Sequence, residues 1–454
     1  MTQHFPTPPG LKYLPYQEDG IRYAMKRDVT LIADEMGLGK TVQAIGVINE
    51  TKATKVLIIC PASLKDNWAR EVDRWAMMPL SIGIAYGPKR FPRRDVVIIN
   101  YDIVNKFLGH LKRIHWDVQI LDECHYLKNW QSRRSKHVLG DGGIPFVKKK
   151  LMLTGTPLMN RPVELWPLLF PHDQRWGDLL EFGKRYCGAS RNASFASGRS
   201  AVGWQFMGAT RLDELNRLLV ERLMIRRLKK DVLKDLPDKI RQVIQIEPPD
   251  HVVAAEKDVK EFLDGHMRNH PFEETVKAMS TVSLNGIGEH ISRIRRETAV
   301  AKIPDAVKFL KGILEEQAKI VVFAWHLDVI AGLEAGLSDY GSVTITGKTP
   351  VKDRGGLVEK FQTDPDTRLF FGNMKAAGVG LTLTASSYVL FLEEDWVPAN
   401  LSQAEDRCHR IGQKDSVLVQ HLVYRGSIDA VMLKSVLRKQ KIADQAIDGV
   451  AAEQ

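Results

Sequence analysis

The chain has 454 residues, enough for two or three domains, and its 44% hydrophobic and 26% charged residues are typical of an ordinary globular protein. Lysine and arginine outnumber aspartate and glutamate by 65 to 55, and the net charge of +10 favours a polyanionic partner such as nucleic acid. Four widely spaced cysteines without a C-x-x-C pair argue against a zinc site or a disulfide framework and favour free thiols. Because no apolar signal core and no 18-residue apolar run occurs, we expect a soluble intracellular protein, cytoplasmic or associated with the nucleus or nucleoid, that makes no membrane contact.

Short apolar runs alternate with helical patterns in the first part of the chain. Continuous apolar runs of this length are typical of strands buried on both faces of a parallel sheet. The alternation of strand and helix predicts a doubly wound α/β sheet. The predicted strands are 29–33, 55–60, 95–100, 117–122 and 150–155, and the predicted helices include 41–50 and 64–75.

The strand pattern stops at about residue 162 and returns at residue 240. Between them we predict a helical insertion over 162–225, with a Gly/Ser-rich loop at 187–200, and a basic connector over 226–240. A second helical insertion is expected at about 250–315. The predicted domains are therefore 1–225 and 241–454; the second contains strands at 240–247, 319–325, 342–347, 367–372, 388–393 and 417–423 and a final helix at 428–447.

The sequence DEMGLGKT (34–41) follows the first predicted strand and precedes a predicted helix. It is close to the pattern G-x-x-x-x-G-K-[ST], with Asp34 in place of the first glycine. Gly37 and Gly39 let backbone amides cradle phosphate oxygens, and the helix N-terminus adds partial positive charge. Lys40 can reach the β- and γ-phosphates of ATP, and the Thr41 hydroxyl can bind Mg²⁺. The alternative is an ordinary Gly-rich turn with a surface lysine.

The strand predicted at 117–122 ends in Asp122 and Glu123. A buried strand that ends in two acids packs poorly unless those acids have a chemical role. Asp122 is predicted to bind Mg²⁺ directly or through water, and Glu123 to polarise the attacking water. The alternative is two solvated carboxylates, which the phosphate-loop pattern upstream disfavours.

Several motifs together resemble the Swi/Snf family of ATP-driven double-stranded DNA translocases, within superfamily two of the helicases. The similarity extends from about residue 11 to 445, and the chain has DECH where the family typically has DEAH or DEGH. Two segments, 182–188 and 224–239, look most like the annealing-helicase subgroup. The resemblance implies two RecA-like lobes of the P-loop NTPase class that bind ATP and Mg²⁺ between them. The motifs are DEMGLGKT, DECH, LTGTP (153–157), ICPASLKDNW (59–68), NYDIV (100–104), AAGVGLTLTASS (376–387) and QAEDRCHRIGQ (403–413).

Some residue roles follow from the resemblance alone. Gln17 resembles the glutamine that reads adenine through its amide, although a solvated surface glutamine is a strong alternative. His125, Thr154 and Thr156 resemble residues that couple hydrolysis to lobe movement; for the two threonines, turn chemistry is the alternative. The predicted nucleotide-binding residues are Gln17, Gly37, Leu38, Gly39, Lys40, Thr41 and Gln403.

A translocase needs a grip on DNA that ignores base sequence, which means phosphate contacts. By motif, the expected contacts lie in both lobes, and small residues in the second lobe let its backbone approach DNA. Lys375 replaces a frequent threonine and is expected to add a phosphate contact, whereas Trp396 has a packed core indole as its alternative. Basic clusters at 88–94, 148–150, 226–230 and 293–296 support this grip, although each alone is typical of a solvated face. The predicted DNA-binding residues are Ser63, Asn100, Tyr101, Lys375, Ala377, Gly378, Gly380 and Trp396.

Two arginines, Arg407 and Arg410, are the expected second-lobe contribution to catalysis. If 403–413 is a helix, Leu401, Ala404, Cys408 and Ile411 form one apolar stripe, and Gln403 shares the opposite face with both arginines. The resemblance implies that the arginines stabilise transition-state charge on ATP bound to the first lobe, so turnover would require lobe closure. The alternative is a solvated charged face.

These features predict an ATP-dependent translocase that remodels duplex or branched DNA, or proteins bound to it, without net strand unwinding, as in DNA repair. We expect it to act as a monomer. Alternatives are a strand-separating DNA or RNA helicase of the same superfamily, a motor that acts on RNA polymerase, and a nucleic-acid-binding scaffold without ATPase activity. The presence of Lys40, Asp122, Glu123, Arg407 and Arg410 disfavours the scaffold.

Overall fold

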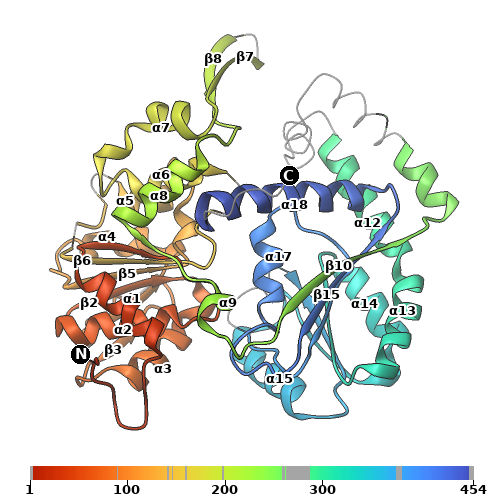
Figure 1. Ribbon diagram of the computed structural model, residues 1–454, viewed down its shortest axis with the longest axis horizontal. Helices are drawn as coiled ribbons and strands as arrows, with labels where there is room; N and C mark the ends of the chain where they lie inside the picture. The colour runs from red at the N-terminus through yellow and green to blue at the C-terminus, as the bar shows by residue number, and fades with distance from the viewer. Residues whose placement is uncertain are drawn as a thin grey trace. The chain divides into compact units, whose positions relative to one another are not determined.

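The computed structural model describes residues 4–88, 90–140, 143–145, 147–158, 161–196, 199–257, 261, 287–374 and 381–448 (Figure 1). The chain divides into two compact units, Met1–Leu233 with Lys441–Gln454, and Lys234–Gln440. Each unit is built on one parallel sheet with helices packed on both faces. The predicted α/β class with two doubly wound lobes is therefore confirmed.

The first sheet has seven parallel strands in the order β3-β4-β2-β5-β6-β1-β9. All five predicted strands are present, because strands covered on both faces appear in the sequence as unbroken apolar runs. Two further strands, β3 and β9, are only three and two residues long and escaped prediction. The strands are β1 Val29–Ile32, β2 Val56–Cys60, β3 Ile82–Ile84, β4 Val96–Asn100, β5 Val118–Asp122, β6 Lys149–Leu153 and β9 Met224–Ile225.

Alternating side chains of these strands feed two hydrophobic cores. Ile58 and Cys60 of β2 pack in the core formed with helices α1 Pro15–Met25, α2 Lys40–Thr51 and α3 Lys65–Trp75. Leu57 and Ile59 pack in the opposite core. That second core is formed with α4 Val104–Leu111, α5 Arg133–Leu139, α6 Trp166–Leu169, α7 Leu179–Tyr186 and α8 Leu212–Arg222.

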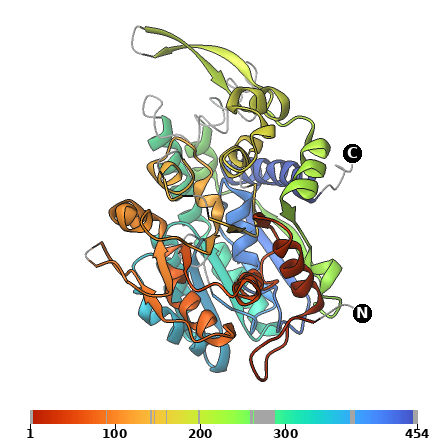
Figure 2. The same ribbon diagram turned by 90° about the vertical axis from the view of Figure 1, so that its left-hand side faces the viewer.

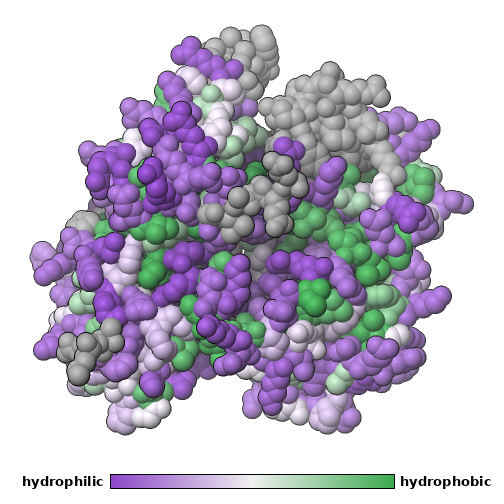
Figure 3. All heavy atoms as spheres, in the orientation of Figure 1, coloured by the Kyte–Doolittle hydropathy of each residue, from purple (hydrophilic) through white to green (hydrophobic). Residues whose placement is uncertain are grey.

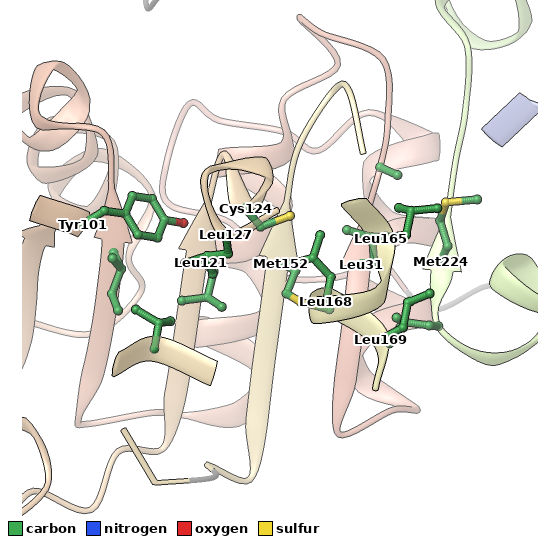
Figure 4. Packing of buried hydrophobic residues seen from close by; sticks show 14 of the residues in the cluster. Leu31, Tyr101, Leu121, Cys124, Leu127, Met152, Leu165, Leu168, Leu169 and Met224 are labelled. Atoms are coloured by element: carbon green, nitrogen blue, oxygen red, sulfur yellow. The ribbon is translucent and has the colours of Figure 1, made fainter. Parts of the chain in front are cut away.

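The cysteine of the DECH motif belongs to this second core. Figure 4 shows Cys124 grouped with Leu121 and Leu127, while Met152 lies beside Leu168. Burial raises the pKa of the Cys124 thiol well above its usual value. All four cysteines are free and buried, as predicted, and Cys124 acts as a small apolar core residue.

The segment predicted as a Gly/Ser-rich loop at 187–200 is a β-hairpin, so that prediction was wrong. Strands β7 Ser190–Ala196 and β8 Arg199–Gln205 pair antiparallel, from Ser190 with Gln205 to Ala196 with Arg199. In Figures 1 and 2 the hairpin extends away from the helices of the first unit. Small polar residues have low strand propensity, and cross-strand pairing outweighs it here.

The second sheet has six parallel strands in the order β10-β15-β14-β11-β13-β12. Every strand predicted in this part of the chain is present. Helices α13 Ile303–Glu316 and α14 Leu327–Gly336, with the end of α12 Ile287–Ala301, cover one face, and α15 Val351–Thr363 and α17 Pro398–Glu405 cover the other. The strands are β10 Lys239–Ile246, β11 Ile320–Ala324, β12 Ser342–Ile345, β13 Leu369–Asn373, β14 Tyr388–Phe391 and β15 Val417–Tyr424.

The last helix, α18 Ile428–Asp448, begins in the second unit, and its final turns group with the first. Ala446 and Ile447 are buried in the first unit's core, and Asn216 donates a hydrogen bond to the Ile447 carbonyl at 2.7 Å. The predicted boundaries placed the whole helix in the second domain. The spacing of its apolar residues predicts a helix but does not indicate which hydrophobic core the helix packs against. Among the described residues, neither α18 nor any other helix is long and apolar enough to span a membrane.

Candidate nucleotide-binding site

The loop between β1 and α2 has the backbone shape that phosphate binding requires. Gly37 and Gly39 have φ angles of +86° and +73°, in the left-handed region that favours glycine. A side chain on Gly39 would also collide with the amide of Gln17. Gly39 is the residue before the first turn of α2, so the loop delivers its amides at a helix N-terminus.

Lys40 lies folded over this loop. Its Nζ donates to the carbonyls of Asp34 at 2.8 Å and Glu35 at 3.3 Å. Burial lowers the pKa of Lys40, and the nearby Glu123 and Asp34 partly oppose that effect. Phosphate oxygens can replace these two carbonyls and would relieve the cost of a desolvated ammonium.

Gln17 is buried against the same loop, which excludes the solvated-glutamine alternative. Its Nε2 donates to the Leu38 carbonyl at 3.4 Å, and its Oε1 accepts from the Leu14 amide at 2.9 Å. The structure therefore brings Gln17 together with the glycine loop, and its contact with adenine stays a prediction.

Arg227 is part of the loop site, a position that the sequence did not reveal. Its guanidinium pairs with the fully buried carboxylate of Asp34, with Nε 2.9 Å from Oδ1. The same guanidinium donates to the Tyr16 carbonyl and, at 2.8 Å, to Oε1 of Gln43. Gln43 in turn donates to Asp34 at 2.8 Å. Asp34, which replaces the first glycine of the pattern, is thus the anchor of a buried network.

Arg226 joins the ends of two strands at the site. Its Nη1 donates to the carbonyls of Ala33, after β1, at 2.6 Å and of Gly155, after β6, at 2.9 Å. Its Nε donates to Asp448 at 2.6 Å. The cluster 226–230 was interpreted as part of a connector and as support for DNA binding. That interpretation was wrong for both arginines, because β9 pairs with β1 and carries the following residues along the phosphate loop.

The two acids at the end of β5 lie in different surroundings. Asp122 is buried; it accepts from Trp68 Nε1 at 2.7 Å and from the Glu123 amide at 3.0 Å. Burial, with the charge of Glu123, raises the pKa of Asp122 to about 7. The interpretation of two solvated carboxylates is therefore excluded for Asp122. A buried carboxylate of this kind is one that a bound cation would hold ionised.

Glu123 has a φ of +49°, unusual for a residue with a side chain, and this bend directs the chain into the turn Cys124–Leu127. Nδ1 of His125 lies 3.2 Å from Oε2 of Glu123 and 3.1 Å from the Thr154 hydroxyl. That hydroxyl also donates to Glu123 at 3.4 Å and accepts from the Thr156 amide at 3.1 Å. The predicted coupling residues thus form one network around Glu123.

The predicted DNA contacts of the first unit are only partly at the surface. Asn100 and Tyr101 are buried: Asn100 accepts from Lys65 Nζ at 3.3 Å, and the Tyr101 hydroxyl donates to the Asp122 carbonyl at 2.8 Å. Ser63 lies in the turn Ala62–Leu64 and is partly exposed. Lys375, Ala377, Gly378 and Gly380 lie outside the described residues.

The predicted helix over 403–413 is wrong beyond Glu405. Helix α17 ends at Glu405, and Ile411 is 51% exposed, although Leu401, Ala404 and Cys408 pack in the core as expected. The reason is a set of contacts from β10 that helical spacing cannot reveal.

The carboxylates after α17 are held from β10. Glu405 pairs with Arg241 at 2.6 Å and Lys239 at 2.9 Å, and Lys239 also lies 3.1 Å from Asp406. Although burial opposes ionisation, these two cations lower the pKa of Glu405 to about 2. His409 Nε2 lies 2.8 Å from the Pro237 carbonyl, which holds the turn that follows.

Gln403 and Arg407 are buried, so neither belongs to a solvated face. Arg410 Nη1 donates to the Leu381 carbonyl and the Thr382 hydroxyl, each at 3.1 Å, and burial lowers the pKa of Arg410. These three residues belong to the second unit, whereas Lys40 and Asp122 belong to the first. Their approach to a nucleotide stays a prediction.

Trp396 has the contacts of a packed indole. It lies beside the small core of Ile291 and Ile294, and the Arg295 guanidinium is 5.7 Å from its ring centre. The same guanidinium lies 5.9 Å from the ring centre of Trp325. Its DNA contact remains a prediction.

One of the basic clusters predicted to support DNA binding, 148–150, contains buried cations. Lys149 donates to the carbonyls of Ala24 at 3.1 Å and Met25 at 2.8 Å, and burial lowers the pKa of Lys150 to about 8. Arg295, of the 293–296 cluster, donates to the Glu394 carbonyl at 3.0 Å. Lys149 and Lys150 are therefore not available to DNA phosphates, whereas Arg295 is partly buried.

A parallel sheet, a glycine loop after β1 whose lysine is folded onto the loop carbonyls, and an acid pair at the end of β5 define a P-loop ATPase with RecA-like lobes. The chain matches the SNF2-related domain over residues 16–270 and the helicase conserved C-terminal domain over residues 302–412. It belongs to the SNF2 family of helicase-like ATPases, and it is an ATP-binding, ATP-hydrolysing enzyme.

Relatives cover nearly all of the chain. It is 36% identical to the mouse DNA annealing helicase and endonuclease ZRANB3, over 96% of this chain and 41% of that protein. It is 34% identical to the Caenorhabditis elegans homolog of SWI/SNF-related matrix-associated actin-dependent regulator of chromatin subfamily A-like protein 1, over 96% of this chain and 62% of that protein. The chain thus spans less than two thirds of these relatives. The Sulfolobus solfataricus SWI2/SNF2 ATPase core, solved in complex with dsDNA, matches with 23% identity and a TM-score of 0.45 over 96% of this chain and 94% of that chain.

Proposed function

We propose that this chain is a DNA-dependent ATPase that translocates along duplex DNA, including branched DNA, without net strand separation. The observation that carries the proposal is the network of Lys40, Asp122, Glu123, His125 and Thr154 around the glycine loop of an SNF2-family chain. The relatives' names point to DNA and chromatin, which supports a DNA-associated location and DNA-bound proteins as further partners. We expect the motor to act as a monomer.

The first unit would bind the nucleotide. The loop amides of 37–41 and Lys40 take the phosphates, and the Gln17 amide turns from the Leu38 carbonyl to the adenine edge. Mg²⁺ would be held by Asp122 and Thr41 and would neutralise phosphate charge. The buried Asp122, with its raised pKa, fits such a cation.

Glu123 would orient the attacking water. Its carboxylate is positioned by His125 and Thr154. The Thr154 hydroxyl also accepts a hydrogen bond from the Thr156 amide. Movement of the segment after β6 would therefore change the position of the Glu123 carboxylate, which provides a physical route for coupling hydrolysis to motion.

The second unit would complete the site with Arg407 and Arg410, and Gln403 would contact the nucleotide or orient Arg407. DNA that contacts both units would favour the closed, active arrangement. The grip would come from phosphate contacts at Ser63, at backbone groups near Asn100 and Tyr101, and at Lys375, Ala377, Gly378, Gly380 and Trp396.

The test measures ATP hydrolysis with plain duplex, single-stranded DNA, forked DNA and RNA, across a range of salt. We expect stimulation by duplex and forked DNA, a steep loss with salt because released counterions drive binding, and little stimulation by RNA. ATP-dependent displacement of a triplex-forming strand would report translocation. Equal or better stimulation by RNA, or efficient separation of a plain duplex, would reject the proposal.

A further inference from the structure

The hairpin of β7 and β8 is anchored at its root, where the chain leaves α7. At the root, the Gly208 amide donates to the Cys187 carbonyl at 2.8 Å, and the Thr210 amide donates to the Tyr186 carbonyl at 2.9 Å. Tyr186 and Cys187 are buried in the core. A side chain on Gly188, which has a φ of +55°, would lie 3.3 Å from the Gly208 backbone. The two strands therefore leave the core at a defined, closely packed point.

Beyond that root, among the residues that the structure describes, the two strands pair with each other and form a separate two-stranded sheet. Figures 1 and 2 both show it projecting from α7. An isolated two-stranded hairpin is at best marginally stable in water. A projecting arm with a firm root is thus suited to gain stability by contact with a ligand.

One aromatic residue of the hairpin is surrounded by cations. Lys184 Nζ lies 5.2 Å and the Arg191 guanidinium carbon 5.1 Å from the ring centre of Trp204. Arg191 and Trp204 are also cross-strand partners. Trp204 is only partly buried, so ring surface remains accessible. Figure 3 shows mainly hydrophilic residues over α7, below the hairpin.

The charge of this segment has one sign. Residues 182–212 include no aspartate or glutamate, and the nearest acids along the chain are Glu181 and Asp213. Its cations are Lys184, Arg185, Arg191, Arg199 and Arg211. Arg185 is paired with Glu214 at 2.7 Å, so the charges offered to a polyanion beside Trp204 are those of Lys184 and Arg191.

We propose that the hairpin binds the unpaired strand at a branch in DNA, with Trp204 stacked on a base and Lys184 and Arg191 on the flanking phosphates. Bases within a duplex already stack on their neighbours, whereas unpaired bases offer a free face to an indole. An acidic peptide would satisfy the cations but has no flat surface for Trp204. This inference rests on DNA being the substrate.

The test compares ATPase stimulation by a forked DNA with single-stranded arms and by a plain duplex of the same sequence. For Trp204→Ala, we expect the forked-DNA concentration at half-maximal stimulation to rise roughly 5- to 150-fold, the range for loss of one stacked base. Trp204→Phe, which keeps a ring, should stay near wild type, and Arg191→Gln should reduce the salt dependence on the fork. Lys26→Gln is the matched charge control, since Lys26 is an exposed residue at the end of α1.

None of these variants should alter stimulation by plain duplex. Photocrosslinking from 5-iodouracil in the single-stranded arm should map to Trp204 and be lost with Trp204→Ala. Wild-type response to the fork in both Trp204→Ala and Arg191→Gln would overturn the inference, as would equal losses on fork and duplex. If no DNA stimulates the wild-type enzyme, the proposed function itself fails.

Discussion

The glycine loop of the first unit and the segment 403–413 of the second unit use buried ion pairs in different ways. In the first unit, Arg227 neutralises the buried Asp34 and holds the loop at which we propose phosphate binds. In the second, the buried Glu405 is neutralised by Lys239 and Arg241 of strand β10. Charged residues that lie close together in one sequence motif can therefore have different roles. Glu405 stabilises the fold, whereas Arg407 and Arg410 are proposed to act in catalysis.

The largest expected effect is at Lys40. Lys40→Ala should abolish ATP turnover, because it removes the cation at the phosphates, while DNA affinity stays near wild type. Turnover and DNA binding are measured separately, with the unfolding temperature as a check of folding. Loss of DNA binding by a folded variant would show that the site is assigned wrongly.

Arg410→Ala tests whether the second unit supplies chemistry. We expect turnover to fall by about 10³–10⁵-fold, as for other arginines that stabilise phosphoryl transfer, with modest changes in ATP and DNA affinity. Arg425→Ala removes an exposed arginine of the same unit, paired with Glu247 at 2.8 Å, and serves as the control. Near-normal turnover of Arg410→Ala would leave this arginine a structural role only.

Arg227→Ala tests the scaffold of the loop. It leaves Asp34 buried without its cation, and we expect the free energy of unfolding to fall by about 3–5 kcal/mol. Arg175→Ala is the matched control, since Arg175 is an exposed residue and a surface ion pair such as the one it forms with Asp173 contributes little to stability. Denaturant titration compares them. Similar losses for both variants would contradict the assignment.

Glu405 predicts an acid-sensitive second unit. Its pKa is about 2 in the folded chain and near 4.5 when unfolded, so its ion pairs stabilise the fold above about pH 4.5 and lose that effect as pH falls toward 2. The full effect is about 3 kcal/mol, at about 1.4 kcal/mol per pKa unit. Glu405→Gln should unfold more easily at pH 7 and show a flatter acid dependence. A dependence equal to wild type would reject this explanation.

Asp122 predicts the opposite trend in the nucleotide-free protein. Its folded pKa of about 7 exceeds the unfolded value, so stability is fully present below about pH 4 and declines as pH rises through about 7. Asp122→Asn should flatten this decline and raise Tm at pH 8 by a few degrees, roughly the effect of 1 kcal/mol, while turnover is lost. A lower Tm for Asp122→Asn than for wild type at pH 8 would contradict this explanation.

Much of the fold follows from local patterns. The central strands of both sheets were predictable because a strand buried on two faces is apolar along its length, and the glycine loop because Gly37 and Gly39 have positive φ angles. The short strand β9 and the hairpin lacked such signals. Their strands are stabilised by pairing with a partner, which sequence composition does not record.

The sequence by itself therefore determined the two α/β units, the glycine loop after β1 and the acid pair at the end of β5, since these depend on neighbouring residues. Only the tertiary structure decided that Arg226 and Arg227 belong to the loop, that α17 stops at Glu405, and that the end of α18 joins the first core. In each case the deciding contact joins residues well over 100 positions apart, such as Arg227 with Asp34, and the free energy of burying a charge depends on that distant partner.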